Sequence, residues 1–204
     1  MKNSLPFLLL ITVFSACSSH TKRIMVIAKG SAIINTDTKT ITLKDGGGTD
    51  EKTADFNQSG ALNIALKKED GTTTISIADK GLYILNGKND TIIGSYQQYG
   101  AVPKETKIIT QAELAKDIDS LIALTENKNV SSANRNYFIL PYHAVKITDN
   151  IDAFIVAPYH RMTSIEKQGN TEPEVYRFWS IKEIRETIDH LKTMTKKSAT
   201  PINN

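Results

Sequence analysis

The chain has 204 residues and a formal charge of +3, from 25 basic and 22 acidic residues that are interspersed along it. This near balance, with no basic stripe, argues against a nucleic-acid partner. Apolar residues make up 40% of the sequence, enough for one hydrophobic core, and the single cysteine excludes an intramolecular disulfide.

The chain opens with the features of an export signal. Lys2 supplies a positive charge, Leu5–Phe14 is an apolar stretch of ten residues, and the small pair Ser15-Ala16 precedes Cys17. This order is typical of a secretory signal peptide. A helix needs about 20 residues to span a bilayer, and this stretch is shorter. We therefore predict that residues 1–16 direct export and are then removed.

The sequence Phe14-Ser15-Ala16-Cys17 resembles the lipobox of bacterial lipoproteins, with Phe14 at a position that usually holds leucine. The resemblance implies that Cys17 is diacylated and becomes the N-terminus, so that residues 17–23 form a lipidated tether and membrane lipid is a partner. Two or more acyl chains anchor a protein stably. Ser18 after the cysteine, where no aspartate stands, resembles lipoproteins sent to the outer membrane of the cell envelope. The alternative is that Cys17 is an ordinary thiol beside a secretory cleavage site.

Residues 24–96 are the β-rich part of the prediction. Short runs of aliphatic and β-branched residues alternate with turn sequences such as Asp45-Gly46, Asp70-Gly71 and Asn86-Gly87. Such pairs are typical of hairpin turns, so we predict an antiparallel β-meander. We interpret Gly46-Gly47-Gly48 as a flexible turn, because the Gly-Lys-Ser/Thr of a phosphate-binding loop does not follow it.

Two helices have clear starting signals. Thr110 and Glu113 form a predicted capping box, which starts a helix that runs from Gln111 to about Glu126. Ser180 and Glu183 repeat the same pattern at the start of a second helix. Apolar residues recur on one face of each helix, which predicts that each helix covers a sheet.

Between the helices, we predict that Tyr137–Thr148 and Ala153–Ile165 pair as a β-hairpin. The predicted fold class is therefore α+β: an antiparallel β-meander followed by helix, β-hairpin and helix. We expect a single domain over residues 24–197, with a β-rich lobe at 24–96 and a helix-hairpin-helix lobe at 110–197. Residues 198–204 are predicted to be a disordered tail.

Pro-Tyr-His occurs twice, at Pro141–His143 and Pro158–His160. In the predicted hairpin the two histidines share a face as diagonal neighbours, about 7 to 8 Å apart. Zinc needs three or four protein ligands, and the nearest acidic residues, Asp149 and Asp152, lie about 20 Å along the strand. We therefore expect no metal site and interpret the histidines as hydrogen-bonded parts of the core. The alternative is a metal-binding, small-ligand-binding or hydrolase site that uses Tyr142, His143, Tyr159 and His160.

Motifs of the common enzyme classes are absent from the sequence, which has neither H-E-x-x-H nor G-x-S-x-G. We therefore predict a non-catalytic envelope lipoprotein that binds or scaffolds a protein or glycan partner at the membrane surface, without a cofactor. A third hypothesis is a carbohydrate site formed by exposed tyrosines, since Tyr96 and Tyr99 flank two glutamines and aromatic residues are common at binding surfaces.

Overall fold

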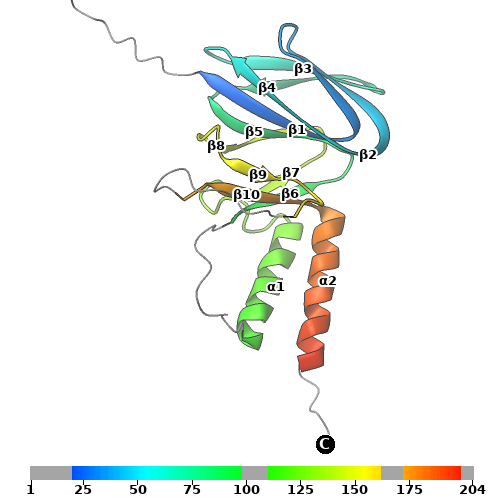
Figure 1. The fold of residues 1–204 in the computed structure, drawn as a ribbon, viewed down its shortest axis with the longest axis vertical. Coiled ribbons are helices and arrows are strands. Elements are labelled where there is room, and N and C mark those ends of the chain that lie inside the picture. The colour runs from blue at the N-terminus through cyan, green and yellow to red at the C-terminus, as the bar shows by residue number, and fades with distance from the viewer. Residues whose placement is uncertain (1–19, 98–109, 162–171, 199–204) are drawn as a thin grey trace, which may run out of the picture.

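The computed structural model describes residues 20–97, 110–161 and 172–198, and about half of them lie in β-strands. The first sheet contains β1 (Thr21–Asn35), β2 (Thr40–Asn57), β3 (Leu62–Lys68), β4 (Gly71–Ile77), β5 (Gly81–Gly87) and β8 (Ala144–Thr148), and the second contains β6 (Ile92–Gln97), β7 (Asn136–Ile139), β9 (Phe154–Val156) and β10 (Val175–Ser180). The helices are α1 (Gln111–Thr125) and α2 (Ile181–Ser198) (Figure 1). The predicted signal peptide, Cys17 and residues 199–204 lie outside the described residues.

The predicted α+β fold with an antiparallel meander is wrong, because the protein is mostly β and its first sheet mixes two strand directions. The strand order is β4-β3-β2-β1-β5-β8. β1 pairs with β5, and β2 with β3, in parallel, whereas the other neighbours are antiparallel. The sheet curls until it is nearly closed, like a barrel. The Asp70-Gly71 turn does join an antiparallel hairpin, β3–β4, but a turn sequence does not specify which strand lies next to that hairpin.

A glycine-rich bulge bends the β1–β2 hairpin. The register shifts at Gly30, where four residues of β2, Asp45–Gly48, oppose a single residue of β1. The glycine run that we predicted to be a flexible turn is therefore a bulge inside a long strand, and bulges increase the local bend and twist of a sheet. Because β2 is bent, its end returns toward its beginning, and β3 pairs in parallel with Thr40–Thr42 after a short connection.

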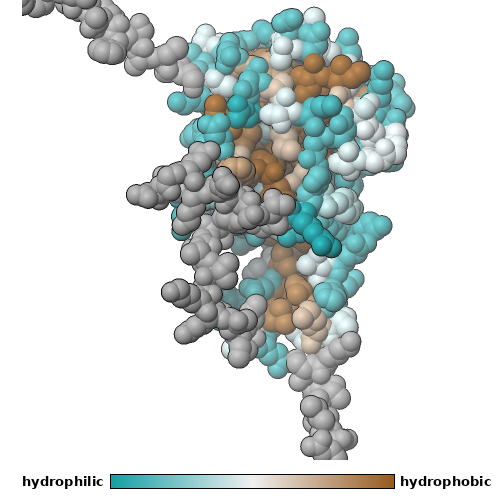
Figure 2. Space-filling view, in the orientation of Figure 1, coloured by the Kyte–Doolittle hydropathy of each residue, from teal (hydrophilic) through white to brown (hydrophobic). Residues whose placement is uncertain are grey.

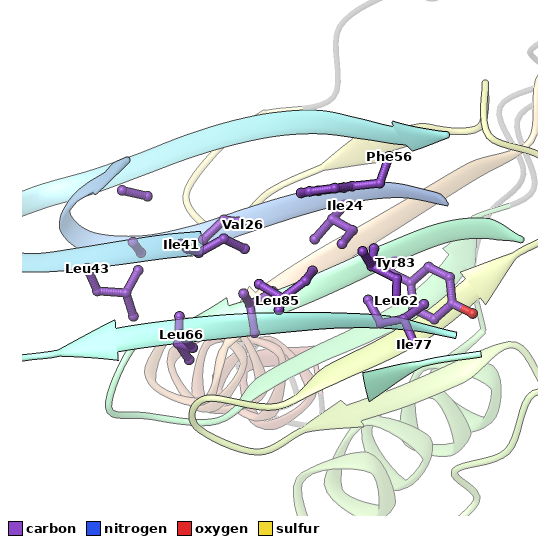
Figure 3. Close-up of a cluster of buried hydrophobic side chains, with 13 residues drawn as sticks. Ile24, Val26, Ile41, Leu43, Phe56, Leu62, Leu66, Ile77, Tyr83 and Leu85 are labelled. Carbon is purple, nitrogen blue, oxygen red and sulfur yellow. The ribbon is translucent and has the colours of Figure 1, made fainter. Parts of the chain in front are cut away.

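Strand β1 contributes side chains to two cores at once. Ile24, Val26 and Ala28 point into the barrel, where they meet side chains of β2, β3 and β5 (Figure 3). Ile27 points the opposite way, toward the second sheet. The neighbouring strand β5 alternates in the same way, with Leu85 inside the barrel and Ile84 outside it. Burial on both faces explains why these two strands are nearly continuous apolar runs.

The second sheet lies between the barrel and the two helices (Figure 1). Its strand order is β7-β6-β10-β9. One face, with Ile92, Tyr176 and Phe178, packs against the outer side of β1 and β5. The other face, with Ile93, packs against α1 and α2. Figure 2 shows apolar side chains where the two helices face each other below the sheet. The molecule therefore has three layers: barrel, sheet and helix pair.

The predicted hairpin of Tyr137–Thr148 with Ala153–Ile165 does not form. β8 pairs with β5 in the first sheet, whereas β7 pairs with β6 and β9 pairs in parallel with β10 in the second. Proline cannot donate a backbone hydrogen bond to a strand ladder. The turn that contains Pro141 therefore ends β7, and the chain passes from the second sheet to the first before the 149–153 turn returns it to β9.

Both predicted helix starts are confirmed. The Thr110 hydroxyl accepts a hydrogen bond from the Glu113 N–H, and the Glu113 carboxylate accepts one from the Thr110 N–H, which is the expected capping box. At the second helix, Ser180 Oγ accepts from the Glu183 N–H at 3.1 Å. The Glu183 carboxylate does not complete a box there but accepts from the N–H of Tyr159 at 3.1 Å. Among the described residues, neither helix is long and apolar enough to cross a membrane.

The first strand begins at Thr21, three residues earlier than predicted, so the segment between Cys17 and the fold is shorter than residues 17–23. Lys22 is 2% exposed, and its Nζ donates to the carbonyl of Gln58 at 2.9 Å. The aliphatic stem of Lys22 shares the inward face of β1 with Ile24, because alternate residues of a strand point the same way. The start of β1 is therefore fixed in the fold and lies between β2 and β5.

Candidate ligand-binding site

The structure places His143 and His160 in two separate turns and gives them different partners. His143 is exposed, and its Nδ1 lies 2.8 Å from the carbonyl oxygen of Pro141. His160 is exposed as well, and its Nε2 lies 3.0 Å from the Glu51 carboxylate on β2. The expectation that both are core residues is therefore wrong. No group of three or more potential metal ligands occurs in the described part of the chain.

Both Pro-Tyr-His sequences are tight turns of the same kind. The His143 N–H donates to the carbonyl of Leu140, and the His160 N–H donates to that of Ala157, each at 3.2 Å. Tyr142 and Tyr159 have φ values of +61° and +66°. A proline followed by a residue with positive φ is the pattern of a type II turn. The repeat in the sequence is therefore a repeated turn rather than a pair of ligands.

Three of the tyrosines singled out in the sequence each have a cationic side chain over the ring. Lys68 Nζ lies 4.2 Å from the ring centre of Tyr142, Lys88 Nζ lies 5.7 Å from that of Tyr159, and the Arg135 guanidinium lies 4.5 Å from that of Tyr96. The Tyr159 hydroxyl also shares a hydrogen bond with Ser180 Oγ at 2.7 Å. Tyr99, the other tyrosine of the proposed carbohydrate cluster, lies outside the described residues.

A cavity of about 410 Å³ opens at one end of the strands of the second sheet, and we call it the Arg135 pocket. Its volume is in the range of small-molecule sites, about 300 to 1,000 Å³. Three parts of the fold form it: the end of β6 with the residue before β7, the turn between β8 and β9 with the start of β9, and the segment that leads into β10. The lining residues are Tyr96, Arg135, Asn150, Asp152, Phe154, Glu172, Pro173 and Glu174.

Glu174 lines the Arg135 pocket, and three hydrogen bonds hold its carboxylate in place. Its Oε1 accepts hydrogen bonds from the hydroxyls of Tyr176 and Thr148, and its Oε2 accepts one from Asn150 Nδ2 at 3.0 Å. Burial, followed by the hydrogen bond to Glu174, raises the pKa of Tyr176 well above its usual range. The tyrosine therefore remains a hydrogen-bond donor at every physiological pH, and three of the hydrogen-bond positions of the Glu174 carboxylate are taken by protein groups.

Two other charged side chains of the pocket have no such partners. Arg135 lies over the Tyr96 ring, and within the described residues it makes no ion pair. Glu172 is exposed and has no hydrogen-bond or ion-pair partner within the same residues. Phe154, which is 37% exposed, and Pro173 supply apolar surface beside these charges. The pocket thus presents a cation, an anion and an apolar wall to solvent.

A second cavity of about 410 Å³ shares Asp152 and Phe154 with the Arg135 pocket. Its wall is stabilised by Arg23 at the start of β1. Arg23 forms a two-point ion pair with Asp55, with distances of 2.7 and 2.8 Å, and its Nη1 donates to Asp152 at 3.0 Å and to the Ile151 carbonyl at 3.0 Å. This network fixes the turn after β8 against the first sheet, so it positions the residues that both cavities share.

Acid is expected to weaken the Arg23 network. The hydrogen bond from Arg23 lowers the pKa of Asp55 below its ordinary value. A carboxyl group whose pKa is lowered by folding stabilises the fold above its unfolded pKa and loses that contribution as the pH falls through its folded pKa. Between about pH 4 and pH 2 the urea midpoint of the wild type should therefore fall more steeply than that of Asp55→Asn. Because the Arg23–Asp55 pair is partly exposed, the free energies of unfolding of the wild type and Asp55→Asn should differ by less than about 1 kcal/mol at neutral pH. Equal slopes in the two proteins would contradict this role.

Sequence reasoning missed the main residues of the pocket. Arg135, Phe154 and Glu172 lie in three segments that are distant in the sequence, and none of them belongs to a motif. Tyr96 was singled out for its aromatic ring, yet its ring supports Arg135 instead of facing solvent alone. The proposed ligand residues Tyr142, His143, Tyr159 and His160 do not line the Arg135 pocket.

Neither a protein-family model, nor a curated protein, nor a solved structure matches this chain.

Proposed function

We propose that this protein is a cell-envelope lipoprotein, anchored through acylated Cys17, that binds a ligand without catalysing a reaction. The observation that carries the proposal is the short distance in sequence between the candidate anchor and the fold. Residues 18–20 separate Cys17 from Thr21, the first residue of β1. At 3.3 to 3.6 Å per extended residue, the cysteine lies at most about 14 Å from the strand.

The buried position of β1 supports a fixed distance between the fold and the bilayer. β1 lies between β2 and β5 and is covered on both faces, so separating it from the sheet would open both cores. Each large apolar side chain removed from a core costs about 1.5 to 3 kcal/mol. The tether therefore cannot lengthen by releasing the first strand, and acylation at Cys17 would hold the barrel beside the membrane.

The Arg135 pocket supports the binding part of the proposal. Arg23, which lines the adjoining cavity and bonds Asp152 in the wall that the two cavities share, is six residues after Cys17, so its Cα lies at most about 20 Å from that of Cys17. The pocket is lined by charged, amide and aromatic groups, and its best-placed carboxylate is occupied by three hydrogen-bond donors. Those three hydrogen bonds fix the position of a negative charge in the pocket, which supports binding of a ligand.

Replacing the anchor tests the proposal. Wild-type protein expressed with its leader in a bacterium should incorporate labelled palmitate and sediment with membranes, because two or more acyl chains anchor stably. Cys17→Ala should lose the label and appear in the supernatant with an unchanged melting temperature, and the matched variant Ser19→Ala should behave as the wild type. Equal labelling and sedimentation of Cys17→Ala would refute the anchor.

A further inference from the structure

We propose that the Arg135 pocket binds a zwitterion, with an anionic phosphate or carboxylate group on Arg135 and an ammonium group on Glu172. This inference rests on the proposed binding function and names the chemical class of its ligand. It starts from one observation: a guanidinium and a carboxylate line the same cavity, yet within the described residues neither one forms an ion pair.

Arg135 is held in a suitable position for an anionic group. Its guanidinium lies 4.5 Å from the ring centre of Tyr96, which is packed edge-on against Tyr176 at 5.7 Å. The contact with the ring covers one side of the guanidinium, and the N–H groups of a guanidinium point along its plane. These donors match the oxygens of a phosphate or a carboxylate, which guanidinium groups bind in a two-point geometry.

The opposite charge comes from the segment before β10. Glu172 precedes Pro173, whose ring restricts the local backbone, and Glu174 follows with its carboxylate fixed by Tyr176, Thr148 and Asn150. Asp152, the third acid of the lining, is paired with Arg23, so Glu172 is the carboxylate of the lining that has no partner within the described residues. Glu174 adds a fixed negative charge nearby, which favours an ammonium group on this side of the cavity.

The charges of the pocket select against a free anion. An anion that approaches Arg135 is repelled by the carboxylates of Asp152, Glu172 and Glu174, whereas a free cation lacks the contact with Arg135. A zwitterion of matching polarity meets an opposite charge at each end. Phe154 and Pro173 supply apolar surface for the methylene groups that join the two ends. Two sources fit this chemistry: a phosphoethanolamine headgroup, and the free termini of an amino acid or short peptide.

Isothermal titration calorimetry on the full-length lipoprotein in detergent tests the proposal with defined probes. O-phosphoethanolamine and the dipeptide Ala-Ala represent the two sources of a zwitterion, and inorganic phosphate and ethanolamine represent its separate charges. At least one zwitterion should bind about tenfold more tightly than either separate ion. Whichever zwitterion binds more tightly identifies the source. Vesicles of phosphatidylethanolamine, compared with phosphatidylglycerol, then show whether the headgroup is recognised within a bilayer.

Single substitutions assign the two ends of the ligand. Arg135→Gln should weaken zwitterion binding about tenfold and remove any residual phosphate binding, and Glu172→Gln should weaken zwitterion binding about tenfold and remove any ethanolamine binding. Arg161→Gln, at an exposed arginine outside the pocket lining, is the matched control and should bind as the wild type. Melting temperatures of all three variants should match the wild type, because these side chains are exposed.

Three results would overturn the zwitterion assignment: no binding of either zwitterion, equal affinity for phosphate and O-phosphoethanolamine, or wild-type affinity in both pocket variants. A neutral oligosaccharide that binds where the zwitterions fail, and that loses affinity in Arg135→Gln, would replace the ligand class but leave the binding function in place. Membrane release of Cys17→Ala is independent of these titrations, so failure of the anchor and failure of the ligand assignment are distinguishable.

Discussion

Replacing Gly30 with alanine is expected to lower the melting temperature by about 10 °C. A Cβ at this position would lie 2.5 Å from the backbone nitrogen of Gly46 and 2.7 Å from the carbonyl carbon of Asp45. Both obstacles are backbone atoms, so rotation of a side chain cannot relieve the contact. The φ of +87° adds a conformational cost of about 1 to 2 kcal/mol for any other residue, and overpacking adds about 1 to 3 kcal/mol. Differential scanning calorimetry measures the change.

Gly47→Ala is the matched control for this experiment, because it adds the same methyl group within the same bulge. A Cβ on Gly47 has no atom within 4 Å. The melting temperature of Gly47→Ala should therefore stay within about 2 °C of that of the wild type, or rise slightly because alanine restricts the unfolded chain. If Gly30→Ala and Gly47→Ala have the same melting temperature, the close contact between Gly30 of β1 and the bulge of β2 is refuted.

The second large effect is expected at Gly94 in β6. The ring of Phe178, on the neighbouring strand β10, lies over this glycine, and a Cβ there would be 2.6 Å from the ring Cζ. Phe178 is fully buried between the sheet and the barrel, so its ring has no space in which to move aside. Gly94→Ala should therefore cost about 2 to 3 kcal/mol of unfolding free energy, measured by urea denaturation.

A compensating substitution makes the Gly94 prediction specific. Phe178→Leu removes the atoms that meet the new methyl group, at the cost of a partly filled space. The double variant Gly94→Ala/Phe178→Leu should lose at least about 1 kcal/mol less unfolding free energy than the sum of the losses in the two single variants, since residues in contact are coupled. Strictly additive costs would show that the ring does not cover Gly94.

Local signals in the sequence predicted the helices correctly. The capping box of Thr110 and Glu113 is complete within four residues, so the interactions that start the helix are all local in the sequence. The β half could not be read in the same way. A two-residue alternation tells which side chains share a face, but it does not tell which strand lies alongside or in which direction it runs. The long apolar run of Ile24–Ala28 indicates a strand that is buried on both faces. The predicted antiparallel meander, in which one face of each strand is solvated, does not account for this run.

The candidate site was less accessible to sequence reasoning than the fold. The repeated Pro-Tyr-His suggested a pair of histidine ligands. In the structure each copy forms a type II turn with tyrosine at positive φ. Arg135 and Glu172 come together because β6 pairs with both β7 and β10, and that pairing is a long-range result of packing. Nothing in the local sequence around either residue indicates the other.

The mass of the N-terminal peptide, measured on protein purified from the membranes in which it is made, tests the anchored-binding account most directly. The account predicts that Cys17 is the first residue, carries a diacylglycerol on its sulfur, and is followed after three residues by the folded strand β1. A free Cys17 thiol on a mature chain recovered without detergent would contradict it.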